Sequence, residues 1–197
     1  MMADSISDLN RVAILSMDLQ TAIVSLYAKN QPEYLPRVAG ALREARGRGV
    51  RVIHVQVGFH PGLPEVNPRN KLFGALKSSV QWQQMFQGPA GAIHPDVARQ
   101  GDEIVITKHR VNAFWGTDLE MILHANQIDT LILFGIATSG VVLSTLVDAS
   151  DRDYRLIVVK DCCLDQDPEL HACLIEKFFP RRAEVISAAD VACMLKA

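Results

Sequence analysis

The chain has 197 residues and a mass of 21.7 kDa, so we expect one domain over residues 1–197. Hydrophobic residues make up 49% and charged residues 21%, which excludes a disordered chain. The net charge of −2 offers no basic field for nucleic acid or anionic lipid. No apolar run approaches the ~20 residues that span a bilayer, and the acidic start MMADSISDLN does not resemble a targeting peptide. We therefore expect a cytoplasmic protein that binds neither membrane nor nucleic acid.

Short apolar runs alternate with helical patterns along the chain. Expected strands are 11–17, 50–57, 103–107, 129–134, 155–160 and 183–186, and expected helices are 32–48, 117–126, 139–151, 168–178 and the C-terminal tail. Thr117 is expected to cap its helix, with Glu120 completing a capping box. This alternation predicts an α/β fold: a three-layer α/β/α sandwich with a six-stranded, mostly parallel, doubly wound sheet of Rossmann-like order.

Residues 58–102 interrupt the alternation with five prolines and six glycines. A long irregular insertion in a compact domain is more often functional than incidental, so we expect a substrate-facing loop here.

The cysteines, at 162, 163, 173 and 193, form no C-x-x-C pair. The favoured interpretation is that they are free thiols buried as small hydrophobic side chains. A redox role would need an exposed thiol of low pKa at Cys162 or Cys163, and no neighbouring residue in the sequence favours one.

Polar residues stand where three of the expected strands end. Asp18 follows the first strand and Lys108 the third, while the fourth leads through Gly135-Ile-Ala-Thr-Ser-Gly140 into a helix. Ligands of doubly wound sheets bind beyond the carboxyl ends of the strands, and a helix N-terminus favours anions. Taken singly, Asp18 fits a turn residue and Lys108 a solvated strand end. Together with the glycine turn they predict an acid–base site.

These motifs, in this order, resemble the isochorismatase-like hydrolase superfamily over about residues 12–186. Supporting segments are Met17-Asp18-Leu19-Gln20, Thr107-Lys108-His109-Arg110, Phe114, Thr117-Asp118-Leu119, Ser144-Thr145, Asp148-Ala149 and Asp151-Arg152. The resemblance implies a six-stranded parallel sheet, a homo-oligomer (dimer or tetramer), and a cis non-prolyl peptide bond within residues 136–138. It also implies a small-molecule substrate.

Amidases of this superfamily use an Asp, a Lys and a Cys. The first two match Asp18 and Lys108, but Val141 stands where the resemblance places the Cys, directly after Gly140. Valine has no nucleophile, so a thioester route is disfavoured. Isochorismatases instead cleave a vinyl ether without a Cys, which would make Asp18 a general acid. Asp/Lys acid–base chemistry on a small anionic or carbonyl-bearing molecule is therefore the first hypothesis. The second is a catalytically silent member that binds a small ligand or a partner.

Candidate substrate contacts are Gln20, Phe59, His60, Phe114, Trp115, Ala137, Thr138 and Gly140. Arg69 and Lys71 in the insertion are candidates for pairing with an anion, or simply solvated charges. Trp115 fits an interface equally well.

We expect no cofactor and no metal. The resemblance to nicotinamidases would place a metal on an Asp and histidines after the second strand, but His60 has no Asp-x-His pattern beside it. It is interpreted as a loop or pocket side chain.

Overall fold

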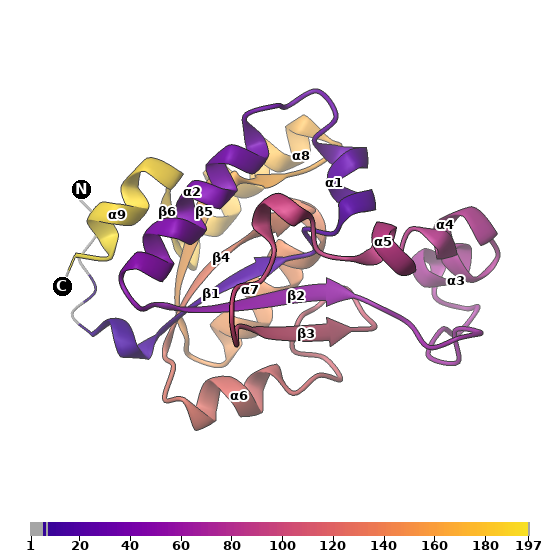
Figure 1. Cartoon of the computed structure of the whole chain (residues 1–197), viewed down its shortest axis with the longest axis horizontal. Helices are drawn as coiled ribbons and strands as arrows, with labels where there is room; N and C mark the ends of the chain where they lie inside the picture. Colours follow the sequence, from indigo (N-terminus) through magenta and orange to yellow (C-terminus); the bar gives the residue numbers. More distant parts are fainter. Residues whose placement is uncertain (1–5, 7, 197) are drawn as a thin grey trace.

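A computed structural model describes residue 6 and residues 8–196. The described residues form a six-stranded sheet of order β3-β2-β1-β4-β5-β6 (Figure 1). The strands are β1 (Val12–Met17), β2 (Arg51–Val57), β3 (Ile104–Lys108), β4 (Thr130–Ile136), β5 (Arg155–Leu164) and β6 (Glu184–Ile186). All neighbouring strands pair in parallel, which confirms the predicted doubly wound sheet.

Helices cover the sheet on two sides. The α-helices are α1 (Thr21–Tyr27), α2 (Tyr34–Gly47), α3 (Lys71–Lys77), α4 (Val80–Gln84), α5 (Gly88–Gly91), α6 (Leu119–Ala125), α7 (Leu143–Asp151), α8 (Pro168–Cys173) and α9 (Val191–Met194). In Figure 1, α2 lies in front of the sheet beside α9, and α7 lies behind it. Glu120 of α6 contacts Arg152 at the end of α7, so these two helices are neighbours.

The central strands are buried along their whole length, because helices cover both faces of the sheet. All six residues of β1 and all seven of β4 are buried. The sequence of such a strand is a continuous apolar run rather than an alternation of apolar and polar residues, so the strand can be recognised from the sequence.

The sheet requires a glycine at one contact between its central strands. Gly135 of β4 has a φ of 147°, and a Cβ there would lie 2.1 Å from the carbonyl oxygen of Met17. Only glycine lets β4 approach β1 this closely. The contact lies one residue before Asp18, so it also fixes where that carboxylate stands.

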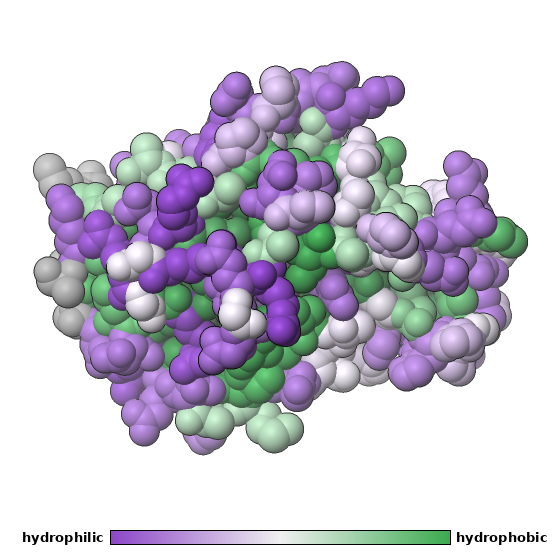
Figure 2. All heavy atoms as spheres, viewed as in Figure 1, coloured by the Kyte–Doolittle hydropathy of each residue, from purple (hydrophilic) through white to green (hydrophobic). Residues whose placement is uncertain are grey.

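The segment 58–102 is more ordered than the sequence predicts. It carries α3, α4 and α5, which form the lobe at the right of Figure 1, and its last part returns to contact α2 at residues 95–97. A separate apolar cluster holds this lobe together, made of Leu63, Val66, Phe73 and Leu76, with Phe59, Phe86 and Val111 against it. In Figure 2 hydrophilic side chains cover much of the lobe's outer surface, interrupted by smaller apolar areas.

Some local expectations were wrong. Helix α1 was missed, because Thr-Ala-Ile-Val-Ser-Leu-Tyr favours a strand by its β-branched content. The predicted capping box does not form: the helix begins at Leu119, and the Glu120 side chain turns to Tyr154 and Arg152 instead. None of the described helices is long and apolar enough to cross a membrane.

Candidate active site

Asp18 stands at the carboxyl end of the sheet's central strand. Its backbone N–H donates to the carbonyl oxygen of Val55 (2.8 Å), and its φ is +56°. Asp and Asn are the non-glycine residues that enter this left-handed region most readily, and a residue held there is a common feature of functional sites. At Asp18 the backbone therefore leaves the extended conformation of β1.

Lys108, the last residue of β3, meets this carboxylate. Its Nζ lies 2.8 Å from Asp18 Oδ2 and also donates to the carbonyl oxygen of Arg110 (3.1 Å). Lys108 is 1% exposed and Asp18 5%, so both charges are removed from water. The predicted convergence of these two strand ends is confirmed.

The second carboxylate oxygen of Asp18 differs from the first in its hydrogen bonding. Asp18 Oδ1 is buried and accepts no hydrogen bond among the described residues. Burial raises the pKa of Asp18, while the charge and hydrogen bond of Lys108 act in the opposite direction. The net direction is upward, so this carboxyl group accepts a proton more readily than an exposed Asp does. It therefore combines a raised pKa with a free oxygen, as a proton-transferring group requires.

The turn after β4 runs beside this pair. The Ile136–Ala137 peptide bond is cis, as the family resemblance implies. The following residues, Thr138–Val142, form a π-helical turn in which Gly140 departs from helical geometry (φ −98°, ψ −106°). The N–H of Gly140 donates within the turn, to the carbonyl oxygen of Ala137 (3.1 Å). That donor is therefore occupied, and Val141 after it is buried.

Two side chains that the sequence analysis missed hold this turn from outside. Asp165, just beyond β5, accepts a hydrogen bond from the Ser139 N–H (2.7 Å), and His171 Nδ1 lies 2.8 Å from the hydroxyl of Thr138. Burial lowers the pKa of His171, with Asp165 opposing. The sequence offered one indication of these two residues, which is that they follow the fifth strand. They were missed because the segment otherwise looks like the ordinary start of a helix.

Two predicted substrate contacts have other roles. Gln20 is fully buried, and its amide bridges β2 to α5: Nε2 donates to the carbonyl oxygens of Val57 (2.9 Å) and Gly91 (2.7 Å), and Oε1 accepts from the Val57 N–H (2.8 Å). Phe114 stacks on Tyr154 beside Arg152, at the end of α7 far from its first residue. Both side chains are engaged in the core, so we leave them out of the site.

The other predicted contacts are placed differently. Phe59 packs edge-on against Phe73 and Phe86 in the lobe, so it forms part of the lobe's apolar cluster. Trp115 is 63% exposed, under the guanidinium of Arg110. The Thr138 side chain is buried against His171, while Arg69 and Lys71 are exposed.

The thiols lie away from this chemistry. Cys162 and Cys163 are buried in β5, and burial raises the pKa of both, that of Cys163 to about 12. Cys173 and Cys193 are free but exposed, which corrects the prediction that all four thiols are buried. A protonated, buried thiol is a poor nucleophile.

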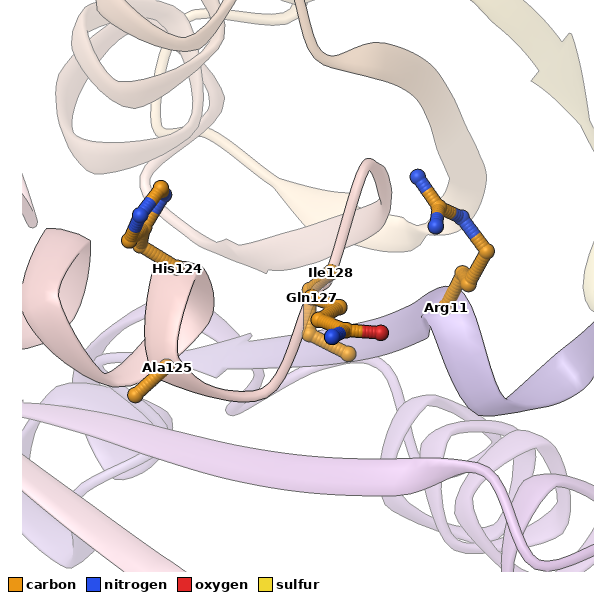
Figure 3. A pocket seen from close by; sticks show the side chains of 5 residues that line it. All are labelled: Arg11, His124, Ala125, Gln127 and Ile128. Atoms are coloured by element: carbon orange, nitrogen blue, oxygen red, sulfur yellow. The ribbon is translucent and has the colours of Figure 1, made fainter.

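A surface hollow of about 560 Å³ lies at the opposite end of the sheet, where β1 and β4 begin (Figure 3). Its lining residues are Arg11, His124, Ala125, Gln127 and Ile128. The Arg11 guanidinium is already paired with Asp129 (2.6 Å), so the hollow offers no unpaired charge from that residue to a ligand.

The lobe adds a group of potential metal ligands. His60, Glu65 and His109 each offer one ligand atom, and these atoms lie within 4.8 Å of one another. The sequence prediction treated His60 alone, because its partners stand five residues later and beyond β3. The structure supplies the partners that the sequence pattern did not show.

Comparisons with known proteins identify the family of this chain. The model of the isochorismatase domain matches residues 12–190. Maleamate amidohydrolase of Pseudomonas putida is 30% identical over 87% of this chain and 78% of its own. N-carbamoylsarcosine amidase of an Arthrobacter species is 29% identical over 81% of this chain but only 61% of its own length.

Solved structures show the same fold. An isochorismatase family protein from Burkholderia thailandensis superposes with a TM-score of 0.80 at 26% identity, covering 98% of both chains. A cysteine hydrolase from Pseudomonas syringae superposes with a TM-score of 0.84 at 20% identity, over 98% of this chain and 95% of its own. With the domain match, the parallel sheet and the buried Asp–Lys pair in place, the chain belongs to the isochorismatase family of hydrolases.

Proposed function

We propose that this protein hydrolyses a small anionic or carbonyl-bearing molecule by acid–base chemistry of Asp18 and Lys108, without a covalent thiol intermediate. The observation that carries the proposal is the buried pair, in which Lys108 holds one carboxylate oxygen and Asp18 Oδ1 has no hydrogen-bond partner in the described part of the chain. Burying two charges costs several kcal/mol per ion before their attraction is counted. A pair with one oxygen left open fits proton transfer better than it fits a purely stabilising contact.

The chemistry follows from this arrangement. Asp18 in its protonated form donates to the substrate from Oδ1, while the Lys108 ammonium holds the other oxygen in place and stabilises the carboxylate that results. On an enol ether, Asp18 protonates the enol carbon, and water then adds at the neighbouring carbon that bears the ether oxygen and returns a proton to the Asp18 carboxylate. The hemiketal that forms then separates into a carbonyl compound and an alcohol.

The residue at position 141 supports this route. By the family resemblance Val141 occupies the nucleophile's position, and a buried isopropyl group cannot attack a carbonyl carbon. The buried cysteines of β5 have raised pKa values, so they do not replace it.

The relatives indicate the class of substrate to try. Their names, maleamate amidohydrolase and N-carbamoylsarcosine amidase, refer to small molecules that combine an amide with a carboxylate. We therefore propose a compact carboxylate-bearing substrate whose scissile bond is an enol ether or an amide.

A product assay tests the proposal. Purified protein is incubated with isochorismate, maleamate, N-carbamoylsarcosine and nicotinamide, alongside Asp18→Asn and Val141→Cys. Asn retains the left-handed backbone of position 18. Val142→Cys is the matched control, because it places a thiol at the adjacent buried position.

Turnover by the unmodified chain that disappears in Asp18→Asn is the expected result. Full activity in a folded Asp18→Asn protein would refute the acid role. Amide turnover that appears only in Val141→Cys, and not in Val142→Cys, would instead identify an amidase scaffold without its nucleophile and favour a ligand-binding protein.

A further inference from the structure

We propose that His171 is a positioning residue of the catalytic site, and that it holds the turn after β4 while its imidazole is neutral. Its Nδ1 lies 2.8 Å from the hydroxyl oxygen of Thr138, the first residue of the π-helical turn 138–142. The effect on catalysis rests on the proposed function, whereas the attachment of the turn to this imidazole does not.

The turn stands where its conformation affects the Asp18 carboxylate. Gly135 of β4 pairs with Met17, the residue before Asp18, so the turn and the carboxylate leave the sheet at the same edge. Lys108 ends β3 at this edge as well. A shift of residues 138–142 therefore changes the surroundings of the pair, and a misplacement of about 1 Å can cost a catalytic site about 100-fold in rate.

Residues 165–171 hold two consecutive residues of the turn. Asp165 Oδ2 accepts from the N–H of Ser139 (2.7 Å), while its Oδ1 accepts from the N–H of Asp167 (3.3 Å). Asp167 caps the start of α8, and its carbonyl oxygen accepts from the N–H of His171 (2.9 Å). The backbone that carries the imidazole is therefore itself attached to the turn, one residue beyond the Thr138 contact.

The Thr138 hydroxyl depends on the imidazole for its hydrogen bond. Thr138 is fully buried, and in the described part of the chain His171 is the partner of its hydroxyl. A neutral imidazole with its proton on Nε2 accepts the hydroxyl proton at Nδ1, whereas both nitrogens of an imidazolium are donors. Protonation of His171 therefore leaves the hydroxyl proton without an acceptor. A buried donor without a partner costs free energy, so the turn is held less firmly.

The groups around the ring favour its neutral form. Burial lowers the pKa of His171, and the charge of Asp165 acts in the opposite direction. Residues 138–142 carry no ionisable side chain. Tyr27 of α1 also faces Asp165, and burial, Asp165 and Asp18 together raise the pKa of its hydroxyl, which stays protonated at pH 7. The other ionisable side chains in and after α8 are exposed: Glu169, Cys173, Glu176 and Lys177. With its pKa below the ordinary value of about 6.5, His171 is neutral at pH 7.

NMR follows this proton without any substrate. The ring nitrogens and backbone amides of ¹⁵N-labelled wild type, Thr138→Val and Thr138→Ser are recorded from pH 5 to pH 8. The dispersion of the amide signals shows whether each variant is folded. His124, an exposed residue of α6, is the internal reference, and the spectrum of His171→Asn assigns the His171 signals.

We expect neutral His171 to carry its proton on Nε2 and to titrate below His124, with the amides of residues 138–142 following the same titration. In Thr138→Val the pKa of His171 should rise, because a hydrogen bond to the neutral form is lost, while Thr138→Ser should resemble the wild type. A neutral proton on Nδ1, or turn amides that do not follow the ring in the wild type, would overturn the proposal.

Turnover of the substrate found by the product assay separates positioning from a purely structural role. His171→Asn places an amide atom near the position of Nδ1, whereas His171→Gln places it nearer Nε2, and neither side chain titrates. The Gln variant should lose up to about 100-fold in kcat with little change in KM, and the Asn variant should recover most of the loss. Equal rates for the two variants would contradict the positioning role.

The pH dependence of the same rates isolates the imidazole. Asp18 is present in both proteins, so the ratio of the wild-type kcat to the His171→Asn kcat should decline as pH falls through the pKa of His171. A ratio that is constant with pH would also contradict the proposal. If the wild type turns over no substrate, the proposed function fails, and the NMR titration still decides whether His171 controls the turn.

Discussion

Removing the Lys108 ammonium should make the stability of the fold depend on pH. In Lys108→Met the side chain keeps its apolar body but ends one atom sooner, and Asp18 loses the charge that opposes its desolvation. The pKa of Asp18 then rises further, since only burial still acts on it. Asp18 is then protonated in the folded variant, because an unpaired buried carboxylate would cost more free energy.

The free energy needed to protonate Asp18 sets the upper limit of the stability lost in Lys108→Met. Protonating a carboxyl group of reference pKa about 3.9 at pH 7 costs about 4 kcal/mol, at about 1.4 kcal/mol per pH unit. The charge-related loss is therefore at most about 4 kcal/mol at pH 7 and about 1.5 kcal/mol at pH 5. The folded variant keeps a proton that the unfolded chain releases above pH 4, so its free energy of unfolding falls as pH rises.

Urea denaturation of the wild type, Lys108→Met, Asp18→Asn and the double variant, at pH 7 and pH 5, measures these values. Asp18→Asn/Lys108→Met should recover most of the loss at pH 7, because no buried charge remains. A smaller loss should persist at both pH values, since the Arg110 carbonyl oxygen no longer receives the Lys108 hydrogen bond. An equal cost for Lys108→Met at the two pH values, or no recovery in the double variant, would refute the reasoning.

Three further outcomes follow from the contacts. Gly135→Ala should destabilise the fold by about 3 kcal/mol or more in the same denaturation assay, because the new methyl group meets the backbone of β1. Gly40→Ala is the control: it has open space around it in α2, so it should be neutral or stabilising by up to about 1 kcal/mol. Asp165→Ala should cost about 1.5–3 kcal/mol and lower turnover, because the Ser139 N–H loses a charged acceptor; unchanged stability and rate would contradict its positioning role. A thiol reagent should modify the two exposed cysteines in the native protein and reach the two on β5 only after unfolding; four equivalents titrated at once would contradict the burial.

The sequence predicted the sheet better than the segments that connect its strands. Strands such as β1 and β4 are apolar on both faces, so they are stable only at the centre of a parallel sheet that helices cover on both sides. Asp18 and Lys108 were identifiable because strand ends in such a sheet share one edge. Helix α1 was not, since its local preference is for a strand and its stability comes from packing, including contacts with α5.

The rest of the site depends on long-range contacts that leave no local pattern. Glu65 and His109 stand 44 residues apart in number, and only the folded lobe brings them together. Gln20 looked available beside Asp18, yet its amide is fully used in joining β2 to α5. The position of a residue along a strand predicts which edge of the sheet its backbone occupies. Its hydrogen-bond partners depend on how segment 58–102 folds, and the sequence does not show this.

The pH dependence of kcat/KM, measured on whichever substrate the product assay identifies, tests the central claim most directly. Because burial raises the pKa of Asp18, and the general-acid role needs its protonated form, activity should fall as pH rises through that raised value. Asp18→Asn should remove the activity itself across the range. Activity that instead increases with pH over the same interval would mean that an ionised base or thiolate does the work, and it would contradict Asp18 as the acid.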